Sequence, residues 1–335
     1  MKRLAAVFSV IATTALAHEF WLQPASFRVA VGATVPLRLL VGEGFKGETW
    51  PRPTRRVRRF VRFGPAGAAD STDLRPALLA DSVAPAVACP TAGTQLVVLT
   101  SAPSFIELPA DKFTAYLREE GLDNALRYRQ QQGETTTKPG REAYRRCAKT
   151  LLLATSSARA PASPADTTYR RVLGLPLELV PEQNPFRLRA GAALTVRVLR
   201  GGQPVPGALV QVWEVQPAPE KGSAPVAPAH FATRANNNGR VLLRLPSSGP
   251  YLVATNYIEP APAALAGRAD WLSTWATLTF GGPEGVAPSR QRPATKWLLL
   301  NMLKMPVMHF PICCYLRLSH RHFCPHALLY EILHR

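Results

Sequence analysis

The chain has few residues of the types that build catalytic centres. Of its 335 residues seven are histidines and five are cysteines, and most of both lie beyond residue 295. Before that point the histidines are His18 and His230. A buried Ser-His-Asp or Cys-His site would have to use one of these two. No Gly-x-Ser-x-Gly elbow and no phosphate-binding loop is present. These absences predict a protein that is not an enzyme.

Acidic residues are also scarce, with 22 Asp and Glu against 40 Lys and Arg and a formal net charge of +18. No pair of carboxylates is placed by sequence for glycoside hydrolysis. A dense basic run comprises Arg52, Arg55, Arg56, Arg58 and Arg59. Such a charge permits contact with anionic lipid or acidic partners, although a solvated strand face is the simpler interpretation of the run. No helix-turn-helix or aromatic-plus-basic module accompanies it, so we predict no nucleic-acid binding.

Long apolar runs are missing. The short apolar run near the start of the chain is typical of a secretory signal. Lys2 and Arg3 precede the apolar run Leu4–Ala12, and Ala15-x-Ala17 is a small-residue cleavage site. The run is too short to cross a bilayer whose apolar core is about 30 Å thick. We therefore predict export to the periplasm through a cleaved signal peptide at residues 1–17, with only peripheral membrane contact. Its removal lowers the formal charge from +18 to +16.

The cysteines of the main part, Cys89 and Cys147, leave two interpretations open. In an oxidising compartment they could form one disulfide. Two buried thiols are the alternative.

Short alternating segments bounded by Gly, Pro and Asn predict a mainly β protein. The first expected strands are 18–31, 35–41, 57–63, 95–100, 104–108 and 150–154. Later ones are 175–180, 194–199, 208–215, 231–233, 241–245, 251–256 and 269–280. The cadence of the later set resembles prealbumin-like extracellular modules, a scaffold that carries no activity of its own.

One stretch has helical spacing instead. Asp111 can cap a helix in which Phe113, Tyr116 and Leu117 share a face and Glu119-Glu120 face solvent. Leu122–Gln132 resumes the pattern up to Gly133. Arg141–Lys149 is expected to form a further short helix.

The predicted architecture is two immunoglobulin-like or prealbumin-like β-sandwich domains, the first with a helical insertion at about 109–149. The expected boundaries are 1–17 signal peptide, 18–155 first sandwich, 156–172 linker, 173–281 second sandwich, and 282–335 linker and atypical tail. The tail from residue 293 holds most of the histidines and cysteines but has no Cys-x-x-Cys pair or zinc-finger spacing. Its composition breaks with the rest, which favours a disordered or aberrant end.

Several segments resemble the exported family catalogued as domain of unknown function 4198. They are 18–24, 41–45, 103–109, 112–113, 116–122, 140–149, 173–181 and 269–271. Some members of this family accompany nickel and cobalt uptake systems. The resemblance implies a periplasmic metal-binding or metal-relay accessory, with a metal-uptake permease or another envelope component as its partner.

Cleavage after Ala17 would make His18 the first residue, with a free α-amine and an imidazole on one residue. Both nitrogens can lose their protons to a metal at neutral pH. A two-nitrogen chelate favours nickel, cobalt or copper over magnesium. His230 is the natural further ligand, with a plain loop histidine as the alternative. Glu19, Glu43 and Glu107 are candidate ligands or partners of ligands, with a surface charge as the simpler interpretation.

Two other functions remain open. A terminal histidine with a second histidine resembles the copper brace of polysaccharide monooxygenases, which would make the chain a copper-dependent oxidase. A structural or adhesive envelope protein that binds no metal is the other.

Overall fold

The computed structural model describes residues 19–50, 54–67, 69–79, 85–157, 160–215 and 227–283. These residues belong to one compact unit. The predicted signal peptide, His18 and the tail from residue 284 lie outside the described residues. None of the described helices is long and apolar enough to cross a membrane.

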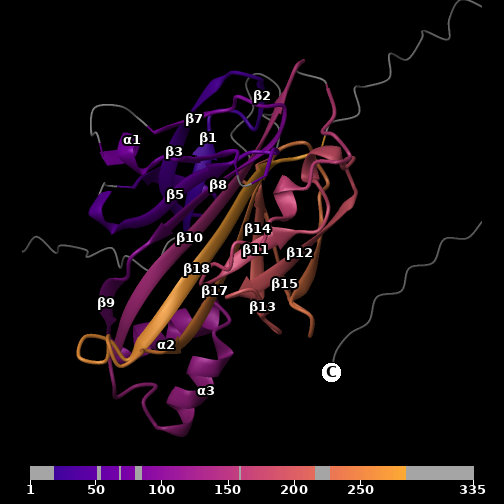
Figure 1. Ribbon diagram of the computed structural model, residues 1–335. Helices are drawn as coiled ribbons and strands as arrows, with labels where there is room; N and C mark the ends of the chain where they lie inside the picture. The colour runs from indigo at the N-terminus through magenta and orange to yellow at the C-terminus, as the bar shows by residue number, and fades with distance from the viewer. Residues whose placement is uncertain are drawn as a thin grey trace, which may run out of the picture. The chain divides into compact units, whose positions relative to one another are not determined.

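The described part is mainly β, as the alternating segments predict, and a ten-stranded sheet lies at its centre. Two strands run side by side along its middle (Figure 1), β10 (Gly140–Thr155) and β18 (Trp271–Gly281). They pair in parallel from Glu142–Trp271 to Thr150–Thr279. Strands from both halves of the chain therefore hydrogen-bond within one sheet. The division into two domains stays a prediction.

The order of the large sheet is β15-β14-β17-β18-β10-β8-β5-β6, with β2 and β9 also paired to β10. The bounds are β2 Arg28–Ala30, β5 Val57–Phe63, β6 Ser71–Asp73, β8 Gly93–Ser101, β9 Ser104–Leu108, β14 Leu209–Glu214, β15 Ala229–Arg234 and β17 Pro250–Pro260.

Two smaller sheets accompany the large one. The first contains β1 (Glu19–Pro24), β3 (Thr34–Glu43), β4 (Lys46–Thr49) and β7 (Ala86–Ala88). The second contains β11 (Glu178–Pro181), β12 (Ala193–Arg200), β13 (Gln203–Pro204) and β16 (Arg240–Arg244). The 3-10 turns η1 (Thr54–Arg56), η2 (Thr168–Arg170) and η3 (Pro185–Arg187) connect strands.

Alternate residues of β10 belong to two different cores. Ala148 and Leu152 pack with Phe20, Leu37 and Phe60 of the first half. The intervening Leu151 and Leu153 pack instead with Val196, Leu243 and Val253 of the second half. Because successive strand residues point to opposite faces, the two small sheets cover opposite faces of β10. This double burial explains the unbroken apolar run at Leu151–Ala154.

Three helices interrupt the strands in the described ranges: α1 (Arg75–Leu79), α2 (Ala110–Glu119) and α3 (Asp123–Gln131). The last two confirm the helical spacing after Pro109, and Figure 1 shows them at the end where β10 and β18 begin. Phe113, Tyr116 and Leu117 pack there against Trp271 and Trp275 of β18.

The predicted helix over Arg141–Lys149 is wrong, because these residues form the first part of β10. Their side chains suit a helix, but β9 pairs with one edge of this segment and β18 with the other. Backbone hydrogen bonds from both neighbours override a weak local propensity. The helices of the insertion therefore end at Gln131.

Cys89 and Cys147 are both buried free thiols in this structure. They lie in different hydrophobic clusters, on the two sides of the large sheet. Of the two interpretations left open by the sequence, the structure has the unpaired one.

A buried ion pair links β10 to the second half. Lys149 Nζ lies 2.5 Å from Glu178 Oε2, and the two side chains are 3% and 0% exposed. Glu178 also accepts hydrogen bonds from the backbone N–H groups of Leu173 and Gly174. Burial lowers the pKa of Lys149, and the charge of Glu178 opposes that effect.

We expect Lys149→Met to lower the free energy of unfolding by about 3–5 kcal/mol, because Glu178 would remain buried and charged without its partner. The double variant Lys149→Met/Glu178→Leu should recover most of that loss, since it leaves no unpaired charge. Denaturant unfolding of the three proteins measures this. Equal losses for the single and double variants would contradict it.

Candidate metal site at the start of β1

The first described strand, β1, is held both by its own small sheet and by the large sheet. β1 pairs with β3, so one edge of its backbone is satisfied there. On β18, the hydroxyls of Thr277 and Thr279 donate to the carbonyls of Phe20 and Leu22 at 2.7 and 2.6 Å. These bonds fix the position of β1 on the large sheet. They set Glu19 against the face of the sheet that carries Trp275.

A small cavity lies at this point. Glu19, Glu120 and Trp275 line it, together with Leu209, Gln211, Ala254, Thr255 and Asn256. Its walls come from β1, the end of α2, β14, β17 and β18. Five segments far apart in sequence therefore meet beside Glu19.

Glu19 is only 5% exposed. Within the described part of the chain, no side chain donates a hydrogen bond to its carboxylate. Burial, with a smaller contribution from the charge of Glu43, raises the pKa of Glu19 to about 7, although a hydrogen bond from its own backbone N–H lowers it. With this pKa, the carboxyl group of Glu19 gains or loses its proton near neutral pH.

Glu120 faces the same cavity from the C-terminal end of α2. Its Oε2 accepts from Asn256 Nδ2 at 2.9 Å and from Gln211 Nε2 at 3.4 Å. Burial first, and then the charges of Glu19 and Glu119, raise the pKa of Glu120 to about 8, although the hydrogen bond from Asn256 lowers it. A carboxylate at a helix C-terminus also meets the negative end of the helix dipole.

Gly121 fixes this end of the helix. It has a φ of +62°, the left-handed conformation of a glycine that terminates a helix. A Cβ built on it would lie 3.0 Å from the Leu209 side chain. The end of α2 is therefore packed directly on β14, which carries Gln211. Close packing at Gly121 explains why Glu120 points into the protein.

The expectation that Glu119 and Glu120 both face solvent is wrong for Glu120. Glu119 is exposed, whereas Glu120 is partly buried and lines the cavity. Helical spacing alone could not reveal this, because β14 and β17 supply the covering residues.

A further carboxyl group is buried near enough to the cavity to interact electrostatically with Glu120. Glu142 of β10 is 2% exposed and accepts hydrogen bonds from Ser273 and, at 3.3 Å, from Tyr116. Burial raises its pKa to about 7, against the effect of these two donors. Tyr116 in turn stacks on Trp275 at a ring distance of 6.2 Å. Glu142 thereby helps to position Tyr116 and, through its ring, Trp275 at the cavity.

The predicted ligands lie in different places. His18 directly precedes Glu19 in the chain and lies outside the described residues. His230 is exposed on β15, stacks on Trp213 at 5.0 Å, and lies 3.2 Å from Gln211 Oε1 through its Nε2. Gln211 thus links His230 to Glu120. Glu107 is exposed on β9 opposite Arg141 and is not among the residues that line the cavity. The roles of these three residues as ligands stay predictions.

Sequence reasoning missed Glu120, Glu142, Gln211 and Asn256. The only hint was the position of Glu120 immediately before a helix-terminating glycine. Across the described ranges, no three His, Cys, Asp or Glu side chains lie close enough together to hold a metal ion. The arrangement does fit the chemistry of a cation, because the carboxyl groups of Glu19 and of Glu120, the latter at a helix C-terminus, are poorly solvated and line one cavity.

Comparison with known proteins bears on the family alone. A family model described as "Domain of unknown function (DUF4198)" matches residues 15–259. No curated protein matches the chain. Among solved structures, the crystal structure of murine CEACAM1b has 10% sequence identity and a TM-score of 0.17, and the similarity covers 80% of this chain and 100% of that one.

Glu142 gives a pH-dependent stability. Between the ordinary value of 4.5 and about 7, the folded protein keeps a proton on Glu142 that the unfolded chain has lost. The unfolded state then binds fewer protons, so the free energy of unfolding falls as pH rises through this window. For a shift of this size the loss is on the order of 3 kcal/mol.

We therefore expect Glu142→Gln to gain stability relative to wild type by about 2–3 kcal/mol between pH ~5 and pH ~8, since glutamine does not ionise. Urea unfolding at both pH values measures the gain. Glu48→Gln, the same change at an exposed position, is the matched control. A difference between Glu142→Gln and wild type that does not vary with pH would refute the assignment.

Proposed function

The chain belongs to the family described as DUF4198, a domain of unknown function, and we propose that it is an exported protein that captures or relays a divalent transition metal. In this proposal the metal is the cargo, and nickel and cobalt are the first candidates. The single observation that carries the proposal is that Glu19 and Glu120 line one cavity, where Glu19 is the residue directly after His18 in the chain.

The carboxyl groups of Glu19, which is buried, and Glu120, which is partly buried, face one cavity, where ionisation of both requires a compensating charge. Each has a pKa raised to near or above neutrality by burial, and the charge of Glu19 raises that of Glu120. Protons can neutralise them, and so can a divalent cation. A cation binds more strongly where several donors converge, because it displaces the protons and the carboxylates then ligate the cation directly.

The mature N-terminus would complete the donor set. If cleavage leaves His18 first, its amine and imidazole supply two nitrogen donors beside the oxygen donors Glu19 and Glu120. Mixed nitrogen and oxygen donors suit nickel, cobalt and copper better than magnesium or calcium. Asn256 and Gln211 orient Glu120 through their amide N–H groups, as partners of metal ligands commonly do.

The surroundings favour a carrier over an enzyme. The cavity is small, with a volume of about 10 Å³, and Leu209, Ala254 and Trp275 are the apolar residues among those that line it. This is too little for an organic substrate beside a metal. The location in the periplasm, the partnership with an uptake permease and the absence of catalysis all belong to the proposal.

The direct test is metal titration of secreted protein whose intact mass shows His18 as the first residue. We expect binding of nickel or cobalt by calorimetry, with His18→Ala and Glu120→Gln each lowering the affinity about 10–100-fold. Glu48→Gln, the same change on an exposed side chain that does not line the cavity, should leave the affinity unchanged.

A second form of the protein separates the amine from the imidazole. A chain expressed with an initiating methionine before His18 keeps every side chain but moves the amine to another residue. It should bind more weakly than the processed protein. Equal binding by both would remove the amine from the site, and no binding by the processed protein would favour a structural envelope role. Peroxide formation with copper and a reductant would favour the oxidase.

A further inference from the structure

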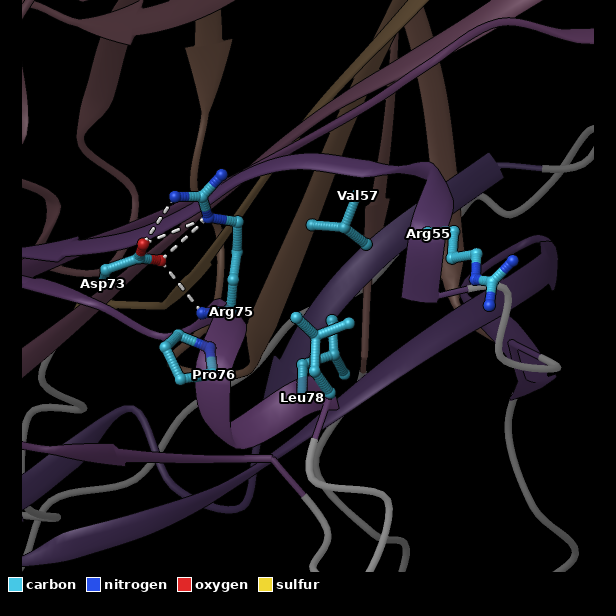
Figure 2. A pocket seen from close by; sticks show the side chains of 7 residues that line it. Arg55, Val57, Asp73, Arg75, Pro76 and Leu78 are labelled. Carbon is cyan, nitrogen blue, oxygen red and sulfur yellow. Dashed lines mark hydrogen bonds and ion pairs between the residues drawn. The ribbon is translucent and has the colours of Figure 1, made fainter.

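A second concave site lies on the first half of the molecule and shares no lining residue with the cavity at Glu19. It is a pocket of about 390 Å³ between η1, β5, β6 and α1, lined by Arg55, Val57, Asp73, Arg75, Pro76, Leu78 and Leu79. Figure 2 shows Val57 and Leu78 between Arg55 on one side and the Asp73–Arg75 pair on the other. We call it the α1 groove.

The floor of the α1 groove is apolar. Val57 and Leu78 are buried in the core below it, and Pro76 adds an apolar ring. Leu79 at its mouth is 55% exposed, one of the few large apolar side chains in the described part of the chain left open to water. An exposed leucine beside a preformed apolar pocket marks a surface that can still bury apolar area.

The rim of the groove is positive. Its acid, Asp73, is fully engaged by Arg75, whose Nε and Nη2 donate at 3.1 and 2.7 Å. Arg55 is exposed and, within the described residues, has no hydrogen bond or ion pair with any acid. Arg58 on the adjoining strand is exposed as well. The surplus charge at this groove is therefore unbalanced, in a chain that is strongly basic overall.

We propose that the α1 groove holds an acyl chain of an anionic lipid at a membrane surface, with Arg55 meeting the lipid phosphate. An acyl chain has no polar groups to satisfy, and the described residues that line the groove between its rims are apolar. An extended peptide in the same groove would leave backbone N–H and C=O groups unpaired, which carries a desolvation penalty. Arginine pairs with phosphate in a bidentate geometry.

The expected binding is weak and salt-dependent. An acyl chain that moves from the bilayer into the groove exchanges one apolar environment for another and so adds little affinity, and basic residues near an anionic surface strengthen the binding until salt screens them. The site would thus recruit the protein to a membrane without anchoring it. This proposal does not depend on metal binding.

Vesicle flotation of the full chain tests it. We expect co-flotation with vesicles of equimolar phosphatidylcholine and phosphatidylglycerol and none with phosphatidylcholine alone. Leu79→Asp and Arg55→Glu should each lower the bound fraction several-fold. The matched controls are Leu242→Asp and Arg244→Glu on β16, where the leucine is 66% exposed and the arginine is exposed too. They should bind as wild type does.

Equal losses for the groove variants and the β16 variants would overturn the proposal in favour of diffuse attraction by the net charge. Absence of binding to the anionic vesicles would overturn it outright. A dodecyl phosphate monomer should compete with the vesicles, whereas glycerol phosphate should not. Competition by glycerol phosphate, or by an acidic peptide, would show that the apolar floor is not used.

Discussion

The structure depends on the parallel pairing of β10 with β18. These strands come from opposite halves of the chain, and neither half could complete the large sheet without the other. Parallel strands need cover on both faces, and the two small sheets supply it on opposite sides of β10. The buried Lys149–Glu178 pair lies at the same junction. Its burial makes a mismatch between the halves costly, so it favours a single register.

The cavity at Glu19 follows from this arrangement. β18 holds β1 through two threonine hydroxyls on one face of the sheet, and α2 and α3 pack on the same strand through Trp271 and Trp275. Glu19 and Glu120 lie where β18 meets these helices. Both lose hydration when the surrounding elements close, and each raised pKa records that loss. Carboxyl groups kept in such a place stabilise the fold less than apolar residues of similar size would.

The two proposed sites use opposite physical chemistry. The cavity at Glu19 is enclosed and has an excess of acid in a basic protein, so it favours small cations. The α1 groove is open and apolar with a positive rim, so it favours anionic amphiphiles. Because they share no lining residue, a change at one leaves the other intact. A protein with both could carry a metal while it stays close to a membrane surface.

The sequence by itself determined the β class and the two helices after Pro109, because these depend on local spacing and composition. It also singled out His18 through the scarcity of other histidines. It misread Arg141–Lys149 as a helix and Glu120 as a solvent-facing residue. Both errors have one cause: the partners that decide these segments are β18, β14 and β17, which lie far away in the chain. Local helix propensity amounts to tenths of a kcal/mol per residue, whereas strand pairing and side-chain burial together contribute several kcal/mol. Only the tertiary structure could therefore bring Glu120 to Glu19, leave the two thiols apart, and place an apolar floor beneath Arg55.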